Sequence, residues 1–529
     1  MKVERHVHIC LLVLLTYFVS SAKGDTLRTV TLSGDTAPGT VAEFSFLSSP
    51  VLNDAGQAAF QGGLTGSGIS SSNDRGIWSE GSGTLTLVAR KGEGAVGTTS
   101  TFSNFGLVTK PIINDTGQTA FRGTLASAVT DIGIWSEGEG SLSLVARNGD
   151  IAPDTSVSLS SILVPSTPVL NDAGQTAFQG ILTGPGVAPS NDRGIWSEGN
   201  GSLALIARAG DGAPGTTASY SHFGSIVLND VGQAAFHGSL TPSTDGIWSE
   251  GGGSLNLVAR NGDGAPGTSA NFSFLSGPAI NNAGQTAFQG LLKGTSGVTT
   301  SDNEGIWSEG SGSLSLVTRK GDGAPGTSVS FAGLGSPVIN RVGQTAFQAS
   351  LTGPGVNINN SEGIWFEDGG SLSLVAREGD GAPGTSASFR SISDPILNGA
   401  GQVAFSSFLT GSGVSSNNDR GIWAQDLSGM LTLIAREGDL LDVDGGPGTD
   451  FRAIIHLSFV TGSGNEDGRA SGFNELGQVA FLAIFADNSR GIFVSNLVAV
   501  PEPTSAVFFG CISIKILALR LKGNRQFGR

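Results

Sequence analysis

The chain has 529 residues, 82 of them glycine, and a formal net charge of −15. A surface this acidic repels nucleic acids and anionic membranes, so we expect no nucleic-acid partner. The only cysteines, Cys10 and Cys511, lie close to the two ends, so the long region between them can form no disulfide, thiolate metal site or cysteine nucleophile.

Residues 1–24 have the order of a secretory signal peptide. Lys2 and Arg5 precede the apolar run ICLLVLLTYFV, and the small residues of SSAKG follow it. A basic start, an apolar run and small residues before the cut are the features of such signals. The sequence therefore predicts an exported protein, whose mature chain begins after Ala22 or Gly24.

One eight-residue phrase then recurs eight times. It reads NDAGQAAF in the first copy and NELGQVAF in the last, and every copy keeps Asn, Gly, Gln, Ala and Phe at the same places. The copies begin at Asn53, Asn114, Asn171, Asn229, Asn281, Asn340, Asn398 and Asn474. An Asn side chain can bond to nearby backbone amides, and Gly can take the left-handed conformation of a tight turn. The phrase therefore predicts a hairpin turn followed by a core Phe.

Each repeat unit has four short apolar segments separated by turn residues. In the first unit these are EFSFLSSPVLN, QAAFQGGL, GIWSEG and LTLVAR, which predict a four-stranded antiparallel sheet per unit. Each GIW triplet supplies one large aromatic residue, which we expect between neighbouring sheets. These are Trp78, Trp135, Trp196, Trp248, Trp307, Trp365 and Trp423. The arginine that ends LVAR is expected to pair with the acid of the GD turn after it.

One repeat unit is divided between the beginning and the end of the repeat region. The eighth copy stops after GIFVSN without an LVAR-GD segment, whereas the mature chain opens on LRTVTLSGDTAPGT, which is such a segment. A propeller closes its ring by letting one terminal strand complete the last blade. The sequence therefore predicts an all-β fold, an eight-bladed β-propeller over residues 25–497 with four-stranded blades. A seven-bladed ring with an extra unit and two small β-domains are the alternatives.

The longest spacing, before Asn474, contains an insertion that we expect at the top or rim of the last blade junction. Its DVDGGPGTD stretch carries Asp442, Asp444 and Asp450. Alternating Asp followed by Gly is similar to the start of a calcium loop, and calcium is the only cofactor that the sequence suggests. The full twelve-residue pattern and its final Glu are missing, which favours the alternative of a solvated acidic loop.

Residues 498–529 form a tail with three parts. Pro501, Glu502 and Pro503 precede an apolar stretch over residues 506–519, and a basic end follows. The apolar stretch is short beside the roughly 20 residues of a membrane span. This order resembles the PEP-CTERM sorting signal of Gram-negative bacteria. The resemblance implies transient membrane anchoring, cleavage near Pro501–Pro503 by an exosortase-type transpeptidase, and delivery to the cell envelope, surface or extracellular matrix.

The repeats resemble a bacterial family named for the same phrase, the choice-of-anchor tandem repeat proteins containing NxxGxxAF. Eight matches spread over nearly the whole mature chain carry this resemblance. It implies an exported protein with one of several alternative C-terminal anchors, and it implies no catalytic residues.

Residues suited to catalysis are scarce between the two ends. His222, His237 and His456 are the only histidines there, Tyr220 is the only tyrosine, and no GxSxG, HExxH or Walker motif occurs. We therefore predict a non-catalytic binding or structural scaffold, with envelope polysaccharide or other surface proteins as partners. The alternative is a secreted propeller enzyme, a lyase or hydrolase of polysaccharide, which should break the repeat symmetry with unusual residues at one place.

Overall fold

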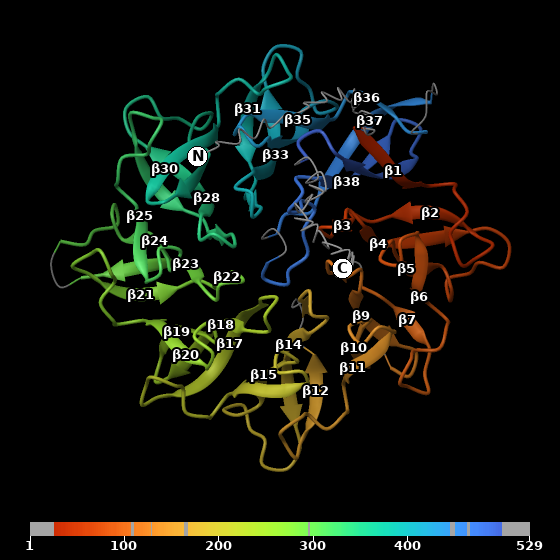
Figure 1. Ribbon diagram of the computed structural model, residues 1–529, viewed down its shortest axis with the longest axis horizontal. Coiled ribbons are helices and arrows are strands. Elements are labelled where there is room, and N and C mark those ends of the chain that lie inside the picture. Colours follow the sequence, from red (N-terminus) through yellow and green to blue (C-terminus); the bar gives the residue numbers. More distant parts are fainter. Residues whose placement is uncertain are drawn as a thin grey trace, which may run out of the picture.

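Eight β-sheets surround a central axis in the computed structural model (Figure 1). The structure describes residues 26–106, 110–128, 130–162, 168–294, 297–444, 450–462 and 466–499. All regular elements in these ranges are β-strands, and none of the described segments is a helix with the length and apolar character needed to cross a membrane. The predicted eight-bladed β-propeller is confirmed.

Blade 1 shows the plan that the other blades repeat. Its antiparallel sheet has the order β2 (Glu43–Leu47), β4 (Ala58–Thr65), β5 (Arg75–Ser79) and β6 (Thr86–Arg90), and β3 (Val51–Leu52) pairs with the start of β4. Pro50 separates β2 from β3, because proline has no N–H for a strand ladder. The turn between β3 and β4 points to the central hub, and the loop between β4 and β5 lies at the rim (Figure 1).

The next six blades follow in chain order. Blades 2 and 3 comprise β7 (Phe102–Asn104), β8 (Ile112–Ile113), β9 (Thr119–Leu125), β10 (Ile132–Ser136) and β11 (Ser143–Arg147), then β12 (Ser158–Ile162), β13 (Val169–Leu170), β14 (Thr176–Thr183), β15 (Arg193–Ser197) and β16 (Ala204–Arg208). Blades 4 and 5 comprise β17 (Ser219–Leu228), β18 (Ala234–Thr241), β19 (Thr244–Ser249) and β20 (Asn256–Arg260), then β21 (Asn271–Leu275), β22 (Ala279–Ile280), β23 (Thr286–Lys293), β24 (Glu304–Ser308) and β25 (Ser315–Arg319). Blades 6 and 7 comprise β26 (Ser330–Leu334), β27 (Val338–Ile339), β28 (Thr345–Thr352), β29 (Glu362–Asp368) and β30 (Ser371–Arg377), then β31 (Ser388–Ile392), β32 (Ile396–Leu397), β33 (Val403–Thr410), β34 (Arg420–Gln425) and β35 (Leu431–Arg436).

Blade 8 combines the first and the last strand of the described chain. Its sheet has the order β1 (Leu27–Leu32), β39 (Arg490–Ser495), β38 (Val479–Phe485), β37 (Phe451–Phe459) and β36 (Leu440–Asp442). Strand β1 is antiparallel to β39, with Leu27 opposite Ser495 and Leu32 opposite Gly491. The amide of Asn496 also donates to the carbonyl of Thr26 at 2.9 Å. The N-terminal strand therefore closes the last blade, as the split unit predicts.

The tryptophans lie in the core between blades, as predicted. All seven side chains are fully buried. In blade 1 the indole of Trp78 stacks on Phe60 of the repeat phrase, with 6.4 Å between ring centroids, and its Nε1 donates to the carbonyl of Pro38 at 3.0 Å. The other six indoles donate to the corresponding turn carbonyls, those of Val96, Pro153, Pro214, Pro266, Pro325 and Pro383. One residue thus fills the core and fixes the turn that leads into its own blade.

The predicted pairing of the LVAR arginines with the GD turns is wrong for most blades. The Nε of Arg90 donates to the carbonyl of Asn73 in the rim loop of its own blade at 3.1 Å, and equivalent bonds hold the rim loops of blades 3, 6 and 7. The rim loop folds back over the strand end and offers this carbonyl at close range. In blade 4, where the loop is short, Arg260 instead makes the predicted ion pair with Asp263 at 2.8 Å.

Candidate functional site

The eight turn asparagines meet at the hub and form a closed ring of hydrogen bonds. In each blade Nδ2 donates to the backbone carbonyl of the asparagine in the next blade, at 2.8–3.1 Å. The last bond runs from Asn474 back to Asn53, 421 residues away in the chain. In blade 1, Oδ1 of Asn53 accepts the amide of Gln57 at 2.8 Å and closes the hairpin. The asparagine is therefore both the predicted turn residue and a joint between blades, and we call these eight residues the asparagine ring.

The glycine of the repeat phrase is also needed where two neighbouring blades meet at the hub. Gly117 has a φ of +81°, and a Cβ on Gly81 of the preceding blade would lie 1.7 Å from the carbonyl oxygen of Gly117. Four later blade interfaces repeat this approach, between Gly138 and Gly174, Gly199 and Gly232, Gly251 and Gly284, and Gly310 and Gly343. The two turns pack backbone against backbone, so a side chain on either glycine would separate the blades.

The residues that directly follow the turn asparagines form a second ring of hydrogen bonds. The amide of Asp54 donates to Oδ1 of Asp115 at 2.7 Å, and Asp115, Asp172 and Asp230 continue the pattern to Asn282. The amide of Glu475 donates to Oδ1 of Asp54 at 2.8 Å. Each short side chain thus accepts the amide of the preceding blade, which would otherwise face the hub without a partner. We call this set the carboxyl ring.

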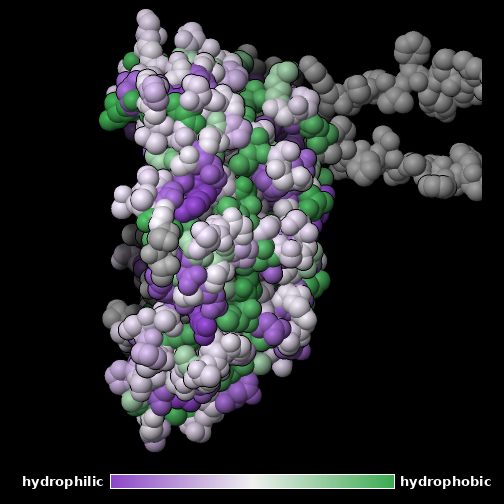
Figure 2. Space-filling view, turned by 90° about the vertical axis from the view of Figure 1, so that its left-hand side faces the viewer, coloured by the Kyte–Doolittle hydropathy of each residue, from purple (hydrophilic) through white to green (hydrophobic). Residues whose placement is uncertain are grey.

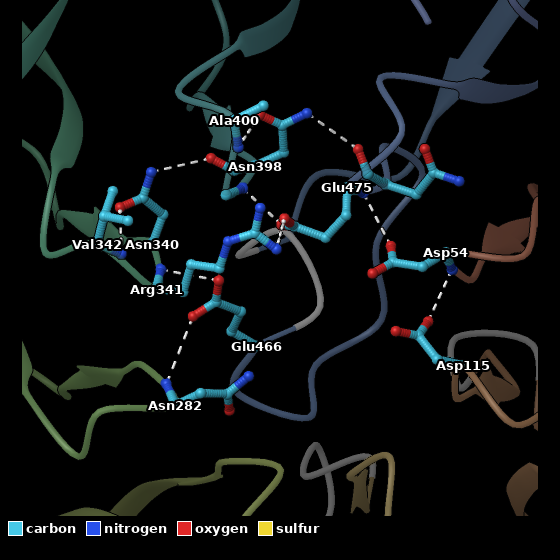
Figure 3. Close-up of polar contacts among 12 residues, drawn as sticks. Asp54, Asp115, Asn282, Asn340, Arg341, Val342, Asn398, Ala400, Glu466 and Glu475 are labelled. Carbon is cyan, nitrogen blue, oxygen red and sulfur yellow. Dashed lines mark hydrogen bonds and ion pairs between the residues drawn. The ribbon is translucent and has the colours of Figure 1, made fainter. Parts of the chain in front are cut away.

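The carboxyl ring is interrupted at two blades and repaired from elsewhere (Figure 3). Arginine has no acceptor and glycine no side chain, so neither Arg341 nor Gly399 can take the amide of the blade before it. Glu466, from the insertion, supplies both missing acceptors: Oε1 takes the amide of Arg341 at 2.8 Å and Oε2 that of Asn282 at 3.4 Å. The longer side chain of Glu475 reaches the amide of Gly399 at 2.5 Å.

The insertion before Asn474 therefore lies partly in the hub, which corrects the prediction of a rim or top position. Its first part, around β36, belongs to the edge of blade 8. Its second part crosses the hub, where the carbonyls of Asp467 and Gly468 accept the amides of Leu228 and Leu170 at 3.1 and 3.0 Å. The innermost strands present unpaired edge amides to the hub, and a chain segment that covers them stabilises the ring.

The carboxyl ring lines a cavity of about 170 Å³ at the hub, together with Arg341, Glu466 and Glu475. Burial, with repulsion between neighbours, raises the pKa of Asp54 to about 6, of Asp115 and Asp172 to about 7, of Asp230 to about 6 and of Glu466 to about 8. Burial also raises the pKa of Glu475, although Arg341 lies 3.0 Å from its Oε2. Several of these carboxyls therefore hold protons near neutral pH and add no charge to the hub.

These pKa values predict how stability depends on pH. Folding raises each pKa above its value in the unfolded chain, so the stabilising contribution is complete below about pH 4 and is lost as the pH rises through about 6 to 8. Raising the pKa of Asp115 from 3.8 to about 7 corresponds to about 4 kcal/mol. We expect the melting temperature, followed by circular dichroism, to fall between about pH 5 and about pH 9.

The variant Asp115→Asn provides the control for this pH dependence. Asn282 already occupies the same place in blade 5, where its Oδ1 accepts the amide of Asp230 at 2.9 Å. An amide at Asp115 should therefore keep the hydrogen bond and make the fall of the melting temperature shallower. A melting temperature that rises with pH, or a variant with an unchanged profile, would contradict the assignment.

The residues predicted for calcium lie at the edge of blade 8, away from the hub. Asp442 ends β36 and accepts the amide of Asp444 at 3.4 Å. Asp450 is held by the guanidinium of Arg452, with 2.7 Å between Nη2 and Oδ2. Within the described ranges, no three acidic, histidine or cysteine side chains form a metal-binding group. The predicted processing residues Pro501, Glu502 and Pro503, like the signal peptide, lie outside the described residues.

Three solved structures, two of them described as β-propellers, are among those to which this chain is similar. The β-propeller domain of the Trilobed protease from Pyrococcus furiosus has 12% identity and a TM-score of 0.38, covering 72% of this chain and 92% of that one. Dipeptidyl peptidase 4 from Porphyromonas gingivalis has 10% identity and a TM-score of 0.44, covering 88% of this chain and 60% of that one. The Dos1 propeller has 10% identity and a TM-score of 0.37, covering 89% and 96%.

Comparison with curated proteins yields no match. A family model, in contrast, matches residues 14–369 and 338–507, which together include all eight blades. On that match, the chain belongs to the Family of unknown function (DUF7453).

Proposed function

We propose that this protein is a non-catalytic binding scaffold that is exported and displayed at the envelope or surface of a Gram-negative-type bacterium. The observation that carries the proposal is the placement of Thr26 and Asn496, near the two ends of the described region, relative to the variable loops. Thr26 and Asn496 are hydrogen-bonded neighbours in blade 8, whereas the loops that differ between repeats lie at the rim (Figure 1). An anchor on the C-terminal tail would hold one point of the disc and leave the loops of the other blades accessible.

The filled hub supports the same proposal. Propellers often bind ligands in the central channel, but here the asparagine ring and the insertion occupy that place. Protonated hub carboxyls satisfy backbone amides, which is a structural use of these groups. A partner of moderate size therefore has its best access at the rim, where hydrophobic residues form a band among hydrophilic projections (Figure 2).

Sorting by the C-terminal tail can be tested in cells that carry an exosortase-type transpeptidase. The full chain is expressed alongside a variant with Pro501→Ala and Glu502→Ala, and a control variant carries Pro354→Ala in an exposed rim loop of blade 6. The wild type and the control should be shortened at the C-terminus and recovered in the envelope or medium. The tail variant should remain full-length. Equal size and location for all three proteins would overturn the sorting proposal.

The alternative function, a secreted lyase or hydrolase, is tested by measuring whether the protein cleaves polysaccharides. Purified protein is incubated with bacterial and plant polysaccharides, with and without calcium, and new reducing ends and unsaturated products are measured. Sustained release of either product would replace the scaffold proposal with an enzymatic one. Calcium binding at Asp442, Asp444 and Asp450 is a separate proposal, tested by calorimetry with wild type and Asp442→Asn.

A further inference from the structure

Blade 4 departs from the plan of the other blades. It carries Ile226 where six sister repeats have a proline, so β17 is one continuous strand over ten residues. The turn between its strands β18 and β19 contains only residues 242–243, whereas the corresponding loop of blade 1 spans residues 66–74. His222, His237 and Tyr220, which are rare residue types in this chain, all lie in this blade. Blade 4 thus departs from the repeat plan in its strands, its rim turn and its residue types.

The short turn leaves a cavity of about 660 Å³ at the rim, between blade 4 and blade 5. This volume falls within the range of about 300–1,000 Å³ that is typical of small-molecule sites. We call this cavity the blade 4 notch. Its lining includes Ser221, His222, His237, Ser239, Asp245 and Phe274.

A fixed carboxylate and an imidazole form the polar part of the blade 4 notch. Oδ1 of Asp245 accepts Nδ2 of Asn261 at 3.1 Å, and Oδ2 accepts the amide of Leu275 at 3.0 Å. Nε2 of His237 lies 3.4 Å from Oδ2 and is itself buried. Burial opposes ionisation of Asp245, but its contacts with His237 and Asn261 outweigh burial and lower its pKa. Asp245 and His237 are therefore paired with each other, and both line the blade 4 notch.

Blade 5 has a carboxylate at the position of Asp245, and comparing the two blades shows which contacts recur and which occur in blade 4 alone. Glu304 of blade 5 accepts the amide of Leu334 at 3.1 Å, just as Asp245 accepts that of Leu275. The partner of Glu304 is the amide group of Gln289, in the register position of His237. The carboxylate position is thus a recurring link between blades, and the imidazole and the open space beside it are specific to blade 4.

Phe274 provides an uncovered aromatic surface. Its side chain is 47% exposed, and its ring centroid lies 6.3 Å from that of His237. The corresponding Phe46 of blade 1 is covered by the guanidinium of Arg490, 4.5 Å from the ring centroid. No such cation covers Phe274 among the described residues, so its ring can contact a ligand in the blade 4 notch.

We propose that the blade 4 notch binds a neutral sugar residue of an envelope or matrix polysaccharide. A pyranose ring has a face of C–H groups, which suits Phe274, and an edge of hydroxyls, which suits His222 and the serines. No three histidine, cysteine or acidic side chains of the described residues are placed to hold a metal ion, and an anion would face Asp245. Glycosidic cleavage uses two carboxyl groups, whereas one lines this cavity, so the site binds without hydrolysing. This inference rests on the proposed binding function and gives it a ligand class.

The test uses the purified mature protein and calorimetric titration with oligosaccharides of glucose, xylose, mannose, galactose and N-acetylglucosamine. Two variants alter the blade 4 notch. Phe274→Ala removes the aromatic surface, and Ser239→Leu fills the space with the residue that blade 5 carries at the same register, Leu291. The control is Phe408→Ala, which removes a Phe that is 38% exposed in blade 7. Circular dichroism verifies that each variant melts like the wild type.

We expect at least one oligosaccharide to bind the wild type and the control equally, and to bind both notch variants roughly tenfold more weakly or not at all. Full binding by Ser239→Leu would overturn the assignment to the blade 4 notch while leaving the scaffold proposal intact. No binding of any oligosaccharide to the wild type would overturn the sugar proposal itself. Surface sorting is measured independently through the tail variant, so failure of one proposal is distinguishable from failure of the other.

Discussion

A chain that lacks residues 27–32 is expected to lose at least about 5 kcal/mol of unfolding free energy, because β1 supplies five ladder pairs with β39 at roughly 1 kcal/mol each. Burial of Leu27 and Leu32 against blade 8 adds to this loss. Arg28 also links β1 to blade 1 through Glu80, at 2.6 Å. Removing the strand therefore weakens both blade 8 and its contact with blade 1. Urea unfolding of the mature protein with and without the strand measures the difference.

Adding the strand back as a separate molecule provides the control. A synthetic peptide of residues 26–39, mixed with the shortened protein, should raise its unfolding midpoint with the logarithm of the peptide concentration once this exceeds Kd, because a ligand that binds only the folded state stabilises it. A peptide with serine in place of Leu27, Val30 and Leu32 should have no effect. An unchanged midpoint in the shortened protein would show that β1 does not complete the ring.

The second large effect is expected from Asn171→Ala in the asparagine ring. The Asn171 side chain is 1% exposed, its Nδ2 donates to the carbonyl of Asn229 at 2.9 Å, and its Oδ1 accepts the amide of Gln175 at 2.8 Å. Alanine leaves the amide of Gln175 without its partner, at about 1–3 kcal/mol, and removes one of the two hydrogen bonds to the carbonyl of Asn229, which keeps the amide of Gly232 at 3.0 Å, at about 1 kcal/mol. Chemical denaturation should therefore show a loss of about 2–4 kcal/mol.

Two further variants separate the joint between blades from the local turn. Asn171→Asp keeps the acceptor for Gln175 but replaces the donor to Asn229, so it should destabilise the protein as strongly as alanine if the ring bond matters. Asn191→Ala removes an asparagine from the exposed rim loop of the same blade and should change stability by less than about 1 kcal/mol. If Asn171→Asp unfolds at the same denaturant concentration as the wild type, the hydrogen bond to Asn229 contributes no stability and Asn171 acts in its own turn alone.

Much of the fold could be predicted from the sequence because its signals are local and repeated. Asn and Gly define a tight turn, alternating apolar residues define strands, and a Trp in each GIW triplet defines a core position. The unit divided between Leu27 and Ser495 also revealed how the ring closes, since only a closed ring needs the missing strand at the other end. These inferences need no knowledge of which residues meet across the hub.

The hub itself could not be predicted, because its contacts join residues that lie a whole blade apart. The residue after each asparagine varies from Asp to Arg and Gly, so the constant part of the repeat phrase predicts no role for it. The structure shows that it accepts an amide from the neighbouring blade, and that Glu466 replaces the acceptor where Arg341 and Gly399 cannot serve. Asp or Asn in five of the eight copies was the available signal, but nothing near Glu466 indicated its destination.

The unusual residues of blade 4 can be seen in the sequence, but the sequence does not show that they lie close together. The histidines at positions 222 and 237 looked like isolated substitutions, since His237 takes the place of a glutamine or arginine in most sister repeats. Their proximity depends on the pairing of β17 with β18, where His222 lies opposite Ser239, and on the short turn that exposes them. Unusual residues gathered at one place are what we expected of the alternative, a propeller enzyme; blade 4 has such residues, and we propose that they serve binding.

Closure of the ring by the N-terminal strand is tested most directly with an engineered disulfide. Leu27 and Ser495 are directly opposite in an antiparallel pair, where Cα atoms are about 4.5–5.5 Å apart, within the disulfide range of about 4.4–6.8 Å. The mature repeat region contains no cysteine, so Leu27→Cys with Ser495→Cys introduces the only pair there. Closure of the ring predicts complete disulfide formation under mild oxidation and a higher melting temperature that reduction reverses. Two thiols that stay free and an unchanged melting temperature would contradict the closed ring.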